Sequence, residues 1–241
     1  MHFTEINMEE THIRLKSDIE NSDIKYFIHS IRQDLKAYIN QNPDFLLSLE
    51  PLKSDDENSV KIVSKMYDSS RKADVGPMAC VAGTISELTL DYLIENNSKY
   101  SIVENGGDIA LINDEKVLCG IYSNNQVLGN NIAFEIKSRK KPLGICTSSG
   151  RIGHSISFGE AESVCVISNS SSLADALATR IANEVKGLTN EDKVHNALEV
   201  AENYREFYKG VLIICDEYVG SAGRLPKIVE SNEFSENIMN L

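Results

Sequence analysis

The segment 172-SLADALAT-179 places a carboxylate and a hydroxyl on an otherwise apolar predicted helix. Asp175 and Thr179 are four residues apart, so in an α-helix they lie on one face. Two hard oxygen ligands from one face suit Mg²⁺, which takes few protein oxygens and completes its shell with water or substrate phosphates. The alternative is capping: Ser172 and Asp175 fit an S-x-x-D pattern, and the helix dipole favours an acidic residue in the first turn. Capping does not account for Thr179, and both interpretations stay open on the residues alone.

A second candidate site is the loop 147-TSSGRIGHS-155, which combines hydroxyls, glycines, a guanidinium and an imidazole. Small polar groups and open backbone amides beside an arginine suit phosphate or another anion. The candidate binding residues are Thr147, Ser148, Ser149, Gly150 and Arg151. His154 is the candidate catalytic residue. The alternative is that His154 is an ordinary polar surface residue.

A third candidate is the turn 104-ENGGDI-109 between two predicted strands. Asn-Gly between such segments is a strong hairpin signal, so Asn105 and Gly106 could form only a tight turn. A second glycine followed by an acid is more than a hairpin requires. Gly106 and Gly107 would let a ligand approach the backbone closely, and Asp108 could accept hydrogen bonds from it.

Taken together, these blocks resemble the ApbE family, the FAD:protein FMN transferases. The matching segments are 79-ACVAGTISE-87, 105-NGGDI-109, 147-TSSGRIGH-154 and 174-ADALAT-179. They stand in the family's order, and the resemblance runs from about Val75 to about Val185. The chain as a whole is similar to a shorter, cytoplasmic branch of ApbE-like proteins in archaea and anaerobic bacteria.

The resemblance implies binding of FAD and Mg²⁺, transfer of FMN to a threonine hydroxyl of a target protein, and release of AMP. It implies that the metal lies at Asp175 and Thr179, with a backbone carbonyl from 79–83. It also implies that the glycine turn borders the flavin, which makes Asn105, Gly106, Gly107 and Asp108 cofactor-binding candidates. Mg²⁺ would neutralise the charge that develops on the AMP leaving group.

The sequence departs from the family pattern at several points. The usual H-I-I-D-P is 154-HSISF-158, which lacks Asp-Pro, and the usual A-K-G is 81-VAG-83, which lacks the lysine. Glu87 stands where the family has an acid. ApbE enzymes are typically exported lipoproteins, whereas residues 1–18 contain no apolar run. Three hypotheses follow: Mg²⁺-dependent chemistry on a flavin or other phosphorylated ligand, a role in sulfide assimilation toward homocysteine in anaerobes, and a non-catalytic binding module.

Composition limits the partners. The 241 residues carry a formal net charge of −12, and the one basic cluster is the short 137-KSRKK-141. An acidic chain lacks the driving force for binding phosphate backbones, so we expect neither nucleic acid nor membrane as a partner. We expect a cytoplasmic protein that binds a small phosphorylated ligand and, for transfer, a protein acceptor; a homodimer is left open. The five cysteines form no C-x-x-C and are expected to be buried free thiols.

The hydrophobic pattern predicts an α+β fold of the ApbE-like type, with a mixed or antiparallel sheet flanked by helices. Helices are expected at 23–41 (capped by Ser22), 43–52, 59–72, 75–97, 171–187 and 191–204, and strands at 100–104, 108–113, 117–123, 131–137, 143–149 and 162–169. A hairpin joined through Gly220 and Gly223 is expected in 210–230. We expect one domain, 1–241, with a helical flank at 1–57 and a core at 58–241.

Overall fold

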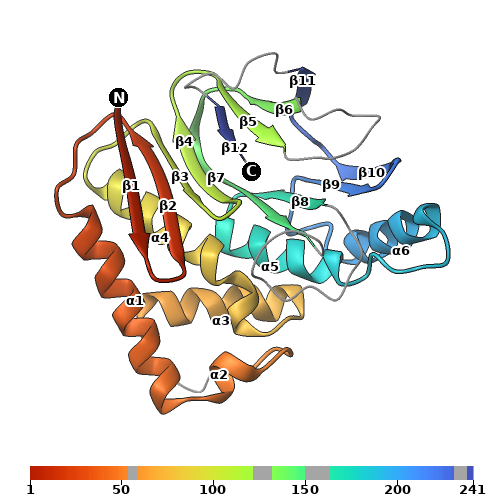
Figure 1. The fold of residues 1–241 in the computed structure, drawn as a ribbon, viewed down its shortest axis with the longest axis horizontal. Helices are drawn as coiled ribbons and strands as arrows, with labels where there is room; N and C mark the ends of the chain where they lie inside the picture. The colour runs from red at the N-terminus through yellow and green to blue at the C-terminus, as the bar shows by residue number, and fades with distance from the viewer. Residues whose placement is uncertain (54–58, 122–131, 150–162, 231–237, 241) are drawn as a thin grey trace.

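The computed structural model describes residues 1–53, 59–121, 132–149, 163–230 and 238–240 (Figure 1). Its helices are α1 (Ile24–Gln41), α2 (Asp44–Leu47), α3 (Lys61–Ala73), the short 3₁₀ helix η1 (Pro77–Cys80), α4 (Val81–Glu95), α5 (Ser171–Ala182) and α6 (Asn190–Asn203). Among these described segments, no helix has both the length and the apolar character needed to cross a membrane.

Within the described residues, the larger of two sheets has eight strands, and all its neighbouring strands pair antiparallel. In spatial order they are β1 (His2–Met8), β2 (Thr11–Ser17), β3 (Ser101–Asn105), β4 (Asp108–Asn113), β7 (Arg139–Ser148), β8 (Ser163–Ser168), β9 (Gly210–Cys215) and β10 (Tyr218–Gly223). The smaller sheet is mixed, because one of its pairs is parallel. Its order is β11 (Lys227–Glu230), β6 (Ile132–Ile136), β5 (Val117–Ile121) and β12 (Ile238–Asn240). The expected α+β architecture is confirmed.

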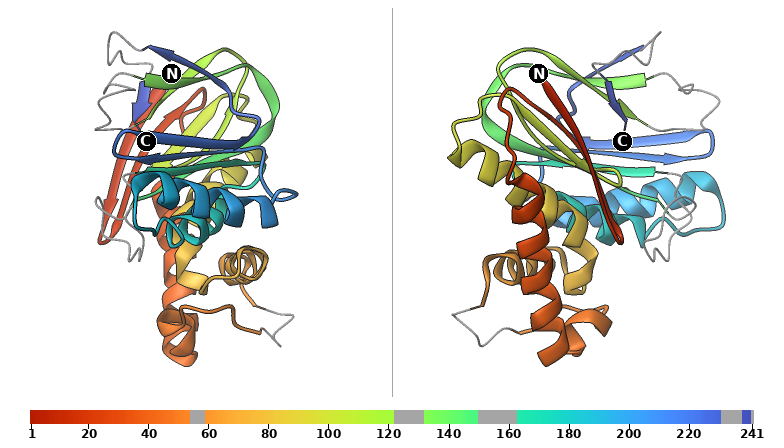
Figure 2. Two further views of the ribbon diagram at one scale, coloured as in Figure 1. Left: turned by 90° about the vertical axis from the view of Figure 1, so that its right-hand side faces the viewer. Right: turned by 60° about the vertical axis from the view of Figure 1, so that its left-hand side comes forward.

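Alternation along the strands builds two hydrophobic cores, one on each face of the larger sheet. In β3, Val103 packs with the helices, whereas Ile102 packs toward the smaller sheet. In β4 the helix-facing residues are Ala110 and Ile112. Asp108 has the same parity, so it points to the helices. Figure 2 shows the resulting layers, with helices on one side of the larger sheet and the smaller sheet on the other.

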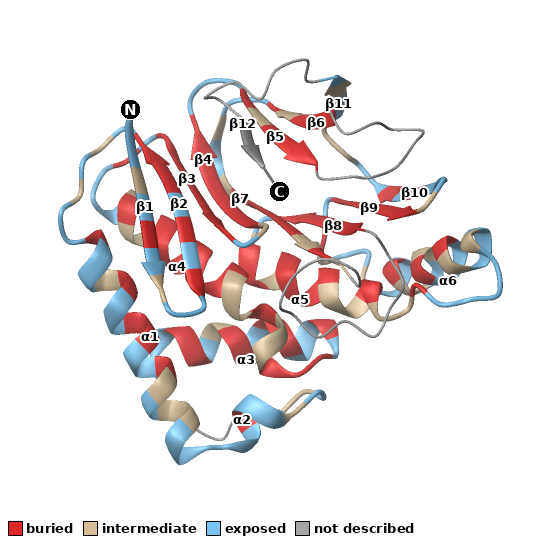
Figure 3. Ribbon diagram, in the orientation of Figure 1, coloured by how far each residue is buried: buried red, intermediate tan, exposed pale blue. Residues whose placement is uncertain are grey.

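Helix α5 lies at the centre of the helical layer and is buried along almost its whole length (Figure 3). Small residues allow its close approach to the neighbouring elements, because a larger side chain would hold the backbones apart. A Cβ on Gly83 of α4 would lie 2.5 Å from the carbonyl oxygen of Ser171. A Cβ on Gly144 of β7 would lie 2.4 Å from the Cα of Ser171. These two glycines therefore hold α5 against α4 and the sheet.

The expectation of a helical flank over residues 1–57 is wrong for the first seventeen residues. They form the hairpin β1–β2, and β2 pairs with β3, so this part of the chain extends the larger sheet. Two local expectations are also wrong. Asp23, not Ser22, is the N-cap of α1, and the C-terminal hairpin turns at Asp216, whose φ of 49° is positive, while Gly220 lies inside β10.

Candidate functional site

The glycine turn is a two-residue hairpin loop between β3 and β4. Asn105 pairs with Asp108, and the two residues between them have positive φ angles, 64° at Gly106 and 102° at Gly107. Glycine takes such angles at no steric cost. The hairpin interpretation is confirmed. The turn also fixes the backbone position of Asp108, the first residue of β4.

Asp175 does not cap its own helix. The N-cap of α5 is Ser170, whose Oγ accepts from the backbone N–H of Leu173. Asp175 lies more than one turn further along, and its Oδ2 accepts a 2.8 Å hydrogen bond from the N–H of Gly83 in α4. The interpretation of Ser172 and Asp175 as a capping pair is therefore wrong, and the carboxylate has a tertiary role between α4 and α5.

Thr179 meets the carbonyl group of Ala79 in η1. The distance from Thr179 Oγ1 to Ala79 O is 3.4 Å. Adjacent ligands of an octahedral Mg²⁺ at about 2.1 Å lie about 3 Å apart, so these two oxygens are close to that spacing. Together with the carboxylate of Asp175, one turn away on α5, they form a set of hard oxygen donors that fits Mg²⁺.

Asp108 is the second buried carboxylate in this region. It is 6 % exposed, and its Oδ1 has no hydrogen-bond partner among the described residues. Burial raises the pKa of Asp108 well above its ordinary value, and the negative charge of Asp175 raises it further. Burial also raises the pKa of Asp175 to about 7, against the opposing effect of the hydrogen bond from Gly83.

The raised pKa of Asp175 predicts how the stability of the ion-free protein depends on pH. The unfolded chain releases this proton near 3.8 and the folded protein releases it near 7, so the native state is destabilised as the pH rises through that window. Below it both states are protonated, and above it the loss is complete. We expect the free energy of unfolding in EDTA to fall between about pH 4 and pH 7, and to fall less in Asp175→Asn. Urea denaturation at several pH values measures this. Parallel curves for the two proteins would contradict it.

Glu87, which stands where the ApbE family has an acid, has a structural role in this region. Its Oε2 accepts from Ser170 Oγ at 2.6 Å and from the N–H of Ser172 at 2.9 Å, at the N-terminus of α5. Its Oε1 binds the ammonium of Lys65 in α3. A carboxylate at this position satisfies open N–H groups and interacts favourably with the helix dipole. Glu87 thus joins α3, α4 and α5.

We expect Glu87→Gln to lower the free energy of unfolding by about 2 kcal/mol, since it removes the ion pair and weakens charge-assisted hydrogen bonds that are mostly buried. Equilibrium urea denaturation measures the change. Glu95→Gln is the control, because Glu95 lies at the end of the same helix and is 69 % exposed in its side chain. Equal stabilities of the two variants would show that Glu87 does not hold the helices together.

The candidate residues of 147–155 are only partly described. Thr147 and Ser148 are the last two residues of β7. Thr147 pairs with Cys165 and points to the face of the larger sheet that the smaller sheet covers. Ser148 is buried and points to the face that the helices cover. The side chain of Thr147 is therefore directed away from Asp108 and Asp175. Ser149 follows the strand. The predicted site residues Gly150, Arg151 and His154 lie outside the described residues.

Asn105 connects the turn to two other segments through its amide. Its Oδ1 accepts from the backbone N–H of His12, and its Nδ2 donates to the carbonyl oxygen of Ala82 in α4. Both polar ends of this side chain are therefore engaged within the protein. Asn105 positions the glycine turn against the helix that carries Gly83.

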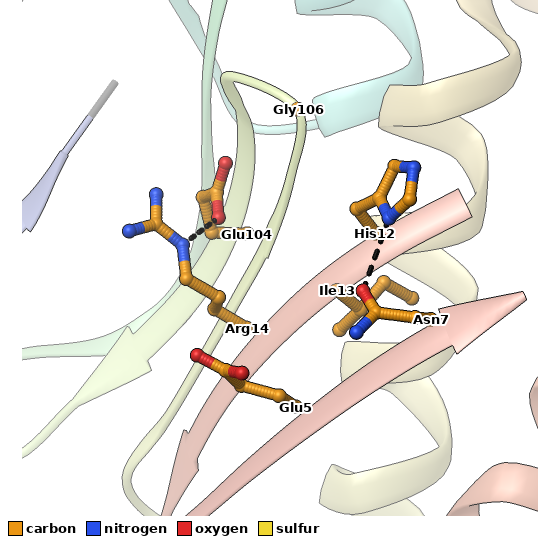
Figure 4. A pocket seen from close by; sticks show the side chains of 7 residues that line it. All are labelled: Glu5, Asn7, His12, Ile13, Arg14, Glu104 and Gly106. Atoms are coloured by element: carbon orange, nitrogen blue, oxygen red, sulfur yellow. Dashed lines mark hydrogen bonds and ion pairs between the residues drawn. The ribbon is translucent and has the colours of Figure 1, made fainter. Parts of the chain in front are cut away.

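A cavity of about 300 Å³ opens beside the glycine turn (Figure 4). Its lining residues are Glu5, Asn7, His12, Ile13, Arg14, Glu104 and Gly106. Arg14 Nε is 2.6 Å from Glu104 Oε2, and His12 Nδ1 is 3.0 Å from Asn7 Oδ1. Ile13 belongs to the core under the helices, so His12 and Arg14 point to the opposite face of the sheet. The cavity and the carboxylates thus lie on different faces near one end of the sheet.

The five cysteines are buried free thiols, as expected. Burial raises the pKa of Cys119 and of Cys165 to about 12 and that of Cys146 well above its ordinary value. Protonated, buried thiols are poor nucleophiles and poor metal ligands, so they give the sulfur-assimilation hypothesis no support. Within the described part of the chain, no three His, Cys, Asp or Glu residues cluster as a metal site. An ion here would need the hydroxyl and carbonyl oxygens of α5 and η1.

The sequence model of the family described as AbpE bacteria matches residues 3–219. A UPF0280 protein of Methanobrevibacter smithii is 58 % identical over 235 residues, which cover 98 % of this chain and 99 % of that protein. A UPF0280 protein of Methanothermobacter thermautotrophicus is 46 % identical over 220 residues, with 91 % and 85 % covered.

Two solved structures have the same fold. The flavin transferase ApbE from Vibrio cholerae matches with a TM-score of 0.54 at 13 % identity, over 97 % of both chains. The flavinyl transferase ApbE of Pseudomonas stutzeri, in its apo form, matches with a TM-score of 0.53 at 13 % identity, over 98 % of this chain and 96 % of that one. At this identity the likeness shows the fold alone. The chain therefore belongs to the AbpE bacteria family, has UPF0280 proteins among its relatives and adopts the ApbE fold.

Proposed function

We propose that this protein binds FAD together with Mg²⁺ and transfers the FMN part to a hydroxyl group of a protein acceptor. The observation that carries the proposal is the oxygen set of Asp175, Thr179 and the carbonyl of Ala79, which joins α5 to η1. The similar solved structures are named as flavin transferases, which supports FAD as the nucleotide.

Bound at these oxygens, Mg²⁺ would supply positive charge beside the diphosphate of the nucleotide. Asp175 is suited to hold the ion because its Oδ2 is fixed by the N–H of Gly83, which leaves Oδ1 for coordination. Thr179 and the Ala79 carbonyl come from two different elements, so their spacing is set by the packing of α5 against η1. The glycine turn, with no side chain at Gly106 and Gly107, leaves room for close approach to the backbone.

In the proposed reaction the acceptor hydroxyl oxygen forms a bond to the phosphorus of the FMN half. The bond from that phosphorus to the oxygen bridging it to the AMP phosphate breaks, and AMP leaves with the bonding electron pair. The hydroxyl proton passes to a base, for which His154 is our proposal on the sequence resemblance. The products are an FMN phosphoester of the acceptor and AMP, which balances atoms and charge.

A thermal-shift screen followed by AMP detection tests the proposal. We expect FAD with Mg²⁺ to raise the melting temperature, because a ligand at a hundred times its dissociation constant adds about 2.7 kcal/mol of stability. FMN with Mg²⁺, ATP with Mg²⁺ and FAD with EDTA are the comparison arms. Chromatography then measures AMP in the presence of threonine-containing acceptor peptides.

The outcomes separate the hypotheses. A shift with FAD and Mg²⁺, and AMP in the same sample, supports flavin transfer. A shift without AMP would favour the non-catalytic binding module, and a larger shift with ATP would favour another phosphorylated ligand. No shift in any arm would contradict the proposal.

A further inference from the structure

Asp108 has a carboxylate oxygen that the described protein does not use. The residue is 6 % exposed, and Oδ1 has no hydrogen-bond partner in the described part of the chain. A buried, unpaired acceptor loses its hydration without compensation, which costs more for a charged group than for a neutral one. Such an atom in a folded protein calls for a partner, and the described residues do not supply one.

The contacts around Asp108 place it next to Asp175. Ser86 of α4 donates from Oγ to the carbonyl oxygen of Asp108 at 2.9 Å. Gly83, one turn earlier on the same helix, donates its N–H to the carboxylate of Asp175. A single turn of α4 therefore holds both acidic residues.

Helix α5 provides an independent link. Ser171, one turn before Asp175, donates from Oγ to the carbonyl oxygen of Ile109 at 3.1 Å. Its carbonyl and hydroxyl oxygens are each 3.2 Å from the sulfur of Cys146. On β7, Cys146 follows Ile145, the partner of Ile109. The backbone of β4 at Asp108 and that of α5 at Asp175 are thus linked twice, once through α4 and once directly by Ser171.

No ion pair in the described part of the chain involves Asp108 or Asp175, although acidic residues nearby, such as Glu87 and Glu104, each have a cationic partner. Two carboxylates held this close together in a buried place repel each other. A divalent cation between them would relieve that repulsion and would use the free oxygen of Asp108.

We propose that Asp108 is a direct oxygen ligand of the divalent ion, facing Asp175, so that β4 joins α5 and η1 in forming the ion site. The inference rests on the proposed function for the presence of the ion and adds a ligand to the set that the family resemblance implies. It also changes the role of Asp108 from contact with the flavin to contact with the metal.

Titration of the full-length protein with Mn²⁺, followed by electron paramagnetic resonance, tests the inference without nucleotide or turnover. We expect Asp108→Asn, which removes a direct ligand, to weaken Mn²⁺ binding by more than the roughly 10- to 100-fold found for groups that only support metal ligands. Asp175→Asn should weaken it at least as much. Asp91→Asn is the control for loss of one acidic charge from this region, because Asp91 lies on α4 and pairs with Lys65. Its Mn²⁺ affinity should equal that of the wild type.

Measurement of FAD affinity in EDTA completes the design. We expect Asp108→Asn to bind FAD in EDTA like the wild type. Unchanged Mn²⁺ affinity in Asp108→Asn, with weakened binding in Asp175→Asn, would overturn this inference alone. Wild-type Mn²⁺ binding that needs both acids, without FAD binding, would support the inference and overturn the proposed function. No Mn²⁺ binding by the wild type would overturn both. Circular dichroism checks folding, and Asp108→Ser replaces Asp108→Asn if the latter does not fold.

Discussion

Asp175→Asn is expected to abolish the Mg²⁺-dependent part of nucleotide binding. Asparagine has nearly the same shape as aspartate, and its side-chain oxygen can still accept the N–H of Gly83, so α4 and α5 should stay in place. It cannot supply the negative charge that a hard divalent cation prefers. We expect the affinity for FAD in the presence of Mg²⁺ to fall at least about 100-fold, or about 2.7 kcal/mol.

Isothermal titration calorimetry with FAD, in Mg²⁺ and in EDTA, measures this effect. The EDTA titrations of wild type and variant should agree, because the change acts through the ion. Asp192→Asn is the control, since Asp192 belongs to the capping box of α6 and not to the candidate site. Equal affinities of Asp175→Asn and wild type in Mg²⁺ would contradict the assignment of Asp175 as a ligand.

The largest expected effect on stability comes from Gly144→Ala. A Cβ at this position would lie 2.4 Å from the Cα and 2.6 Å from the backbone N of Ser171. Both are backbone atoms at the start of α5, so the clash cannot be relieved by rotating a side chain. The helix must move away from β7, which opens a gap in the core between α5 and the sheet. We expect the free energy of unfolding to fall by about 3 kcal/mol, at the upper end of typical overpacking costs.

Urea denaturation of Gly144→Ala measures the loss, and Mn²⁺ binding provides a second readout. Because α5 carries Asp175 and Thr179, its displacement should also weaken ion binding. Gly106→Asn is the matched control: its φ of 64° is tolerated by asparagine, and a Cβ there meets no atom within 4 Å. A Gly144→Ala protein as stable as Gly106→Asn would show that α5 does not need this close approach.

Much of the fold could be predicted from hydrophobic periodicity. The helices α1, α3 and α6 and the strands β3, β4, β5, β6 and β8 lie close to their expected ranges, because each has a strong period or is bounded by turn residues. Helix α5 ends at Ala182, before the expected 187, and β7 starts at Arg139, before the expected 143. The hairpin β1–β2 was missed although Ile13 and Leu15 alternate with polar residues. Strand β2 carries His12, Arg14 and Lys16 on one face, and it pairs with β3, which lies about ninety residues further along the chain. Only that long-range pairing distinguishes the hairpin from an irregular terminus.

The candidate site was predictable only in part. The i, i+4 spacing of Asp175 and Thr179 correctly placed them together, but the local pattern suggested Ser172 as the cap because it does not reveal where the helix begins. The contacts that place these two side chains join Asp175 to Gly83 and Thr179 to Ala79, across about ninety and one hundred residues of sequence. The proximity of Asp108 to Asp175 and the contacts of Glu87 with the N-terminus of α5 also depend on tertiary packing, which no spacing along one element encodes.

The most direct test of the ion site is a crystal structure of the protein with Mn²⁺ and FAD, with data collected for the anomalous scattering of manganese. We expect one anomalous peak within coordination distance of Asp175 Oδ1, Thr179 Oγ1 and Ala79 O, beside the diphosphate of FAD. Well-ordered FAD with the manganese peak elsewhere, or with none near Asp175, would contradict it.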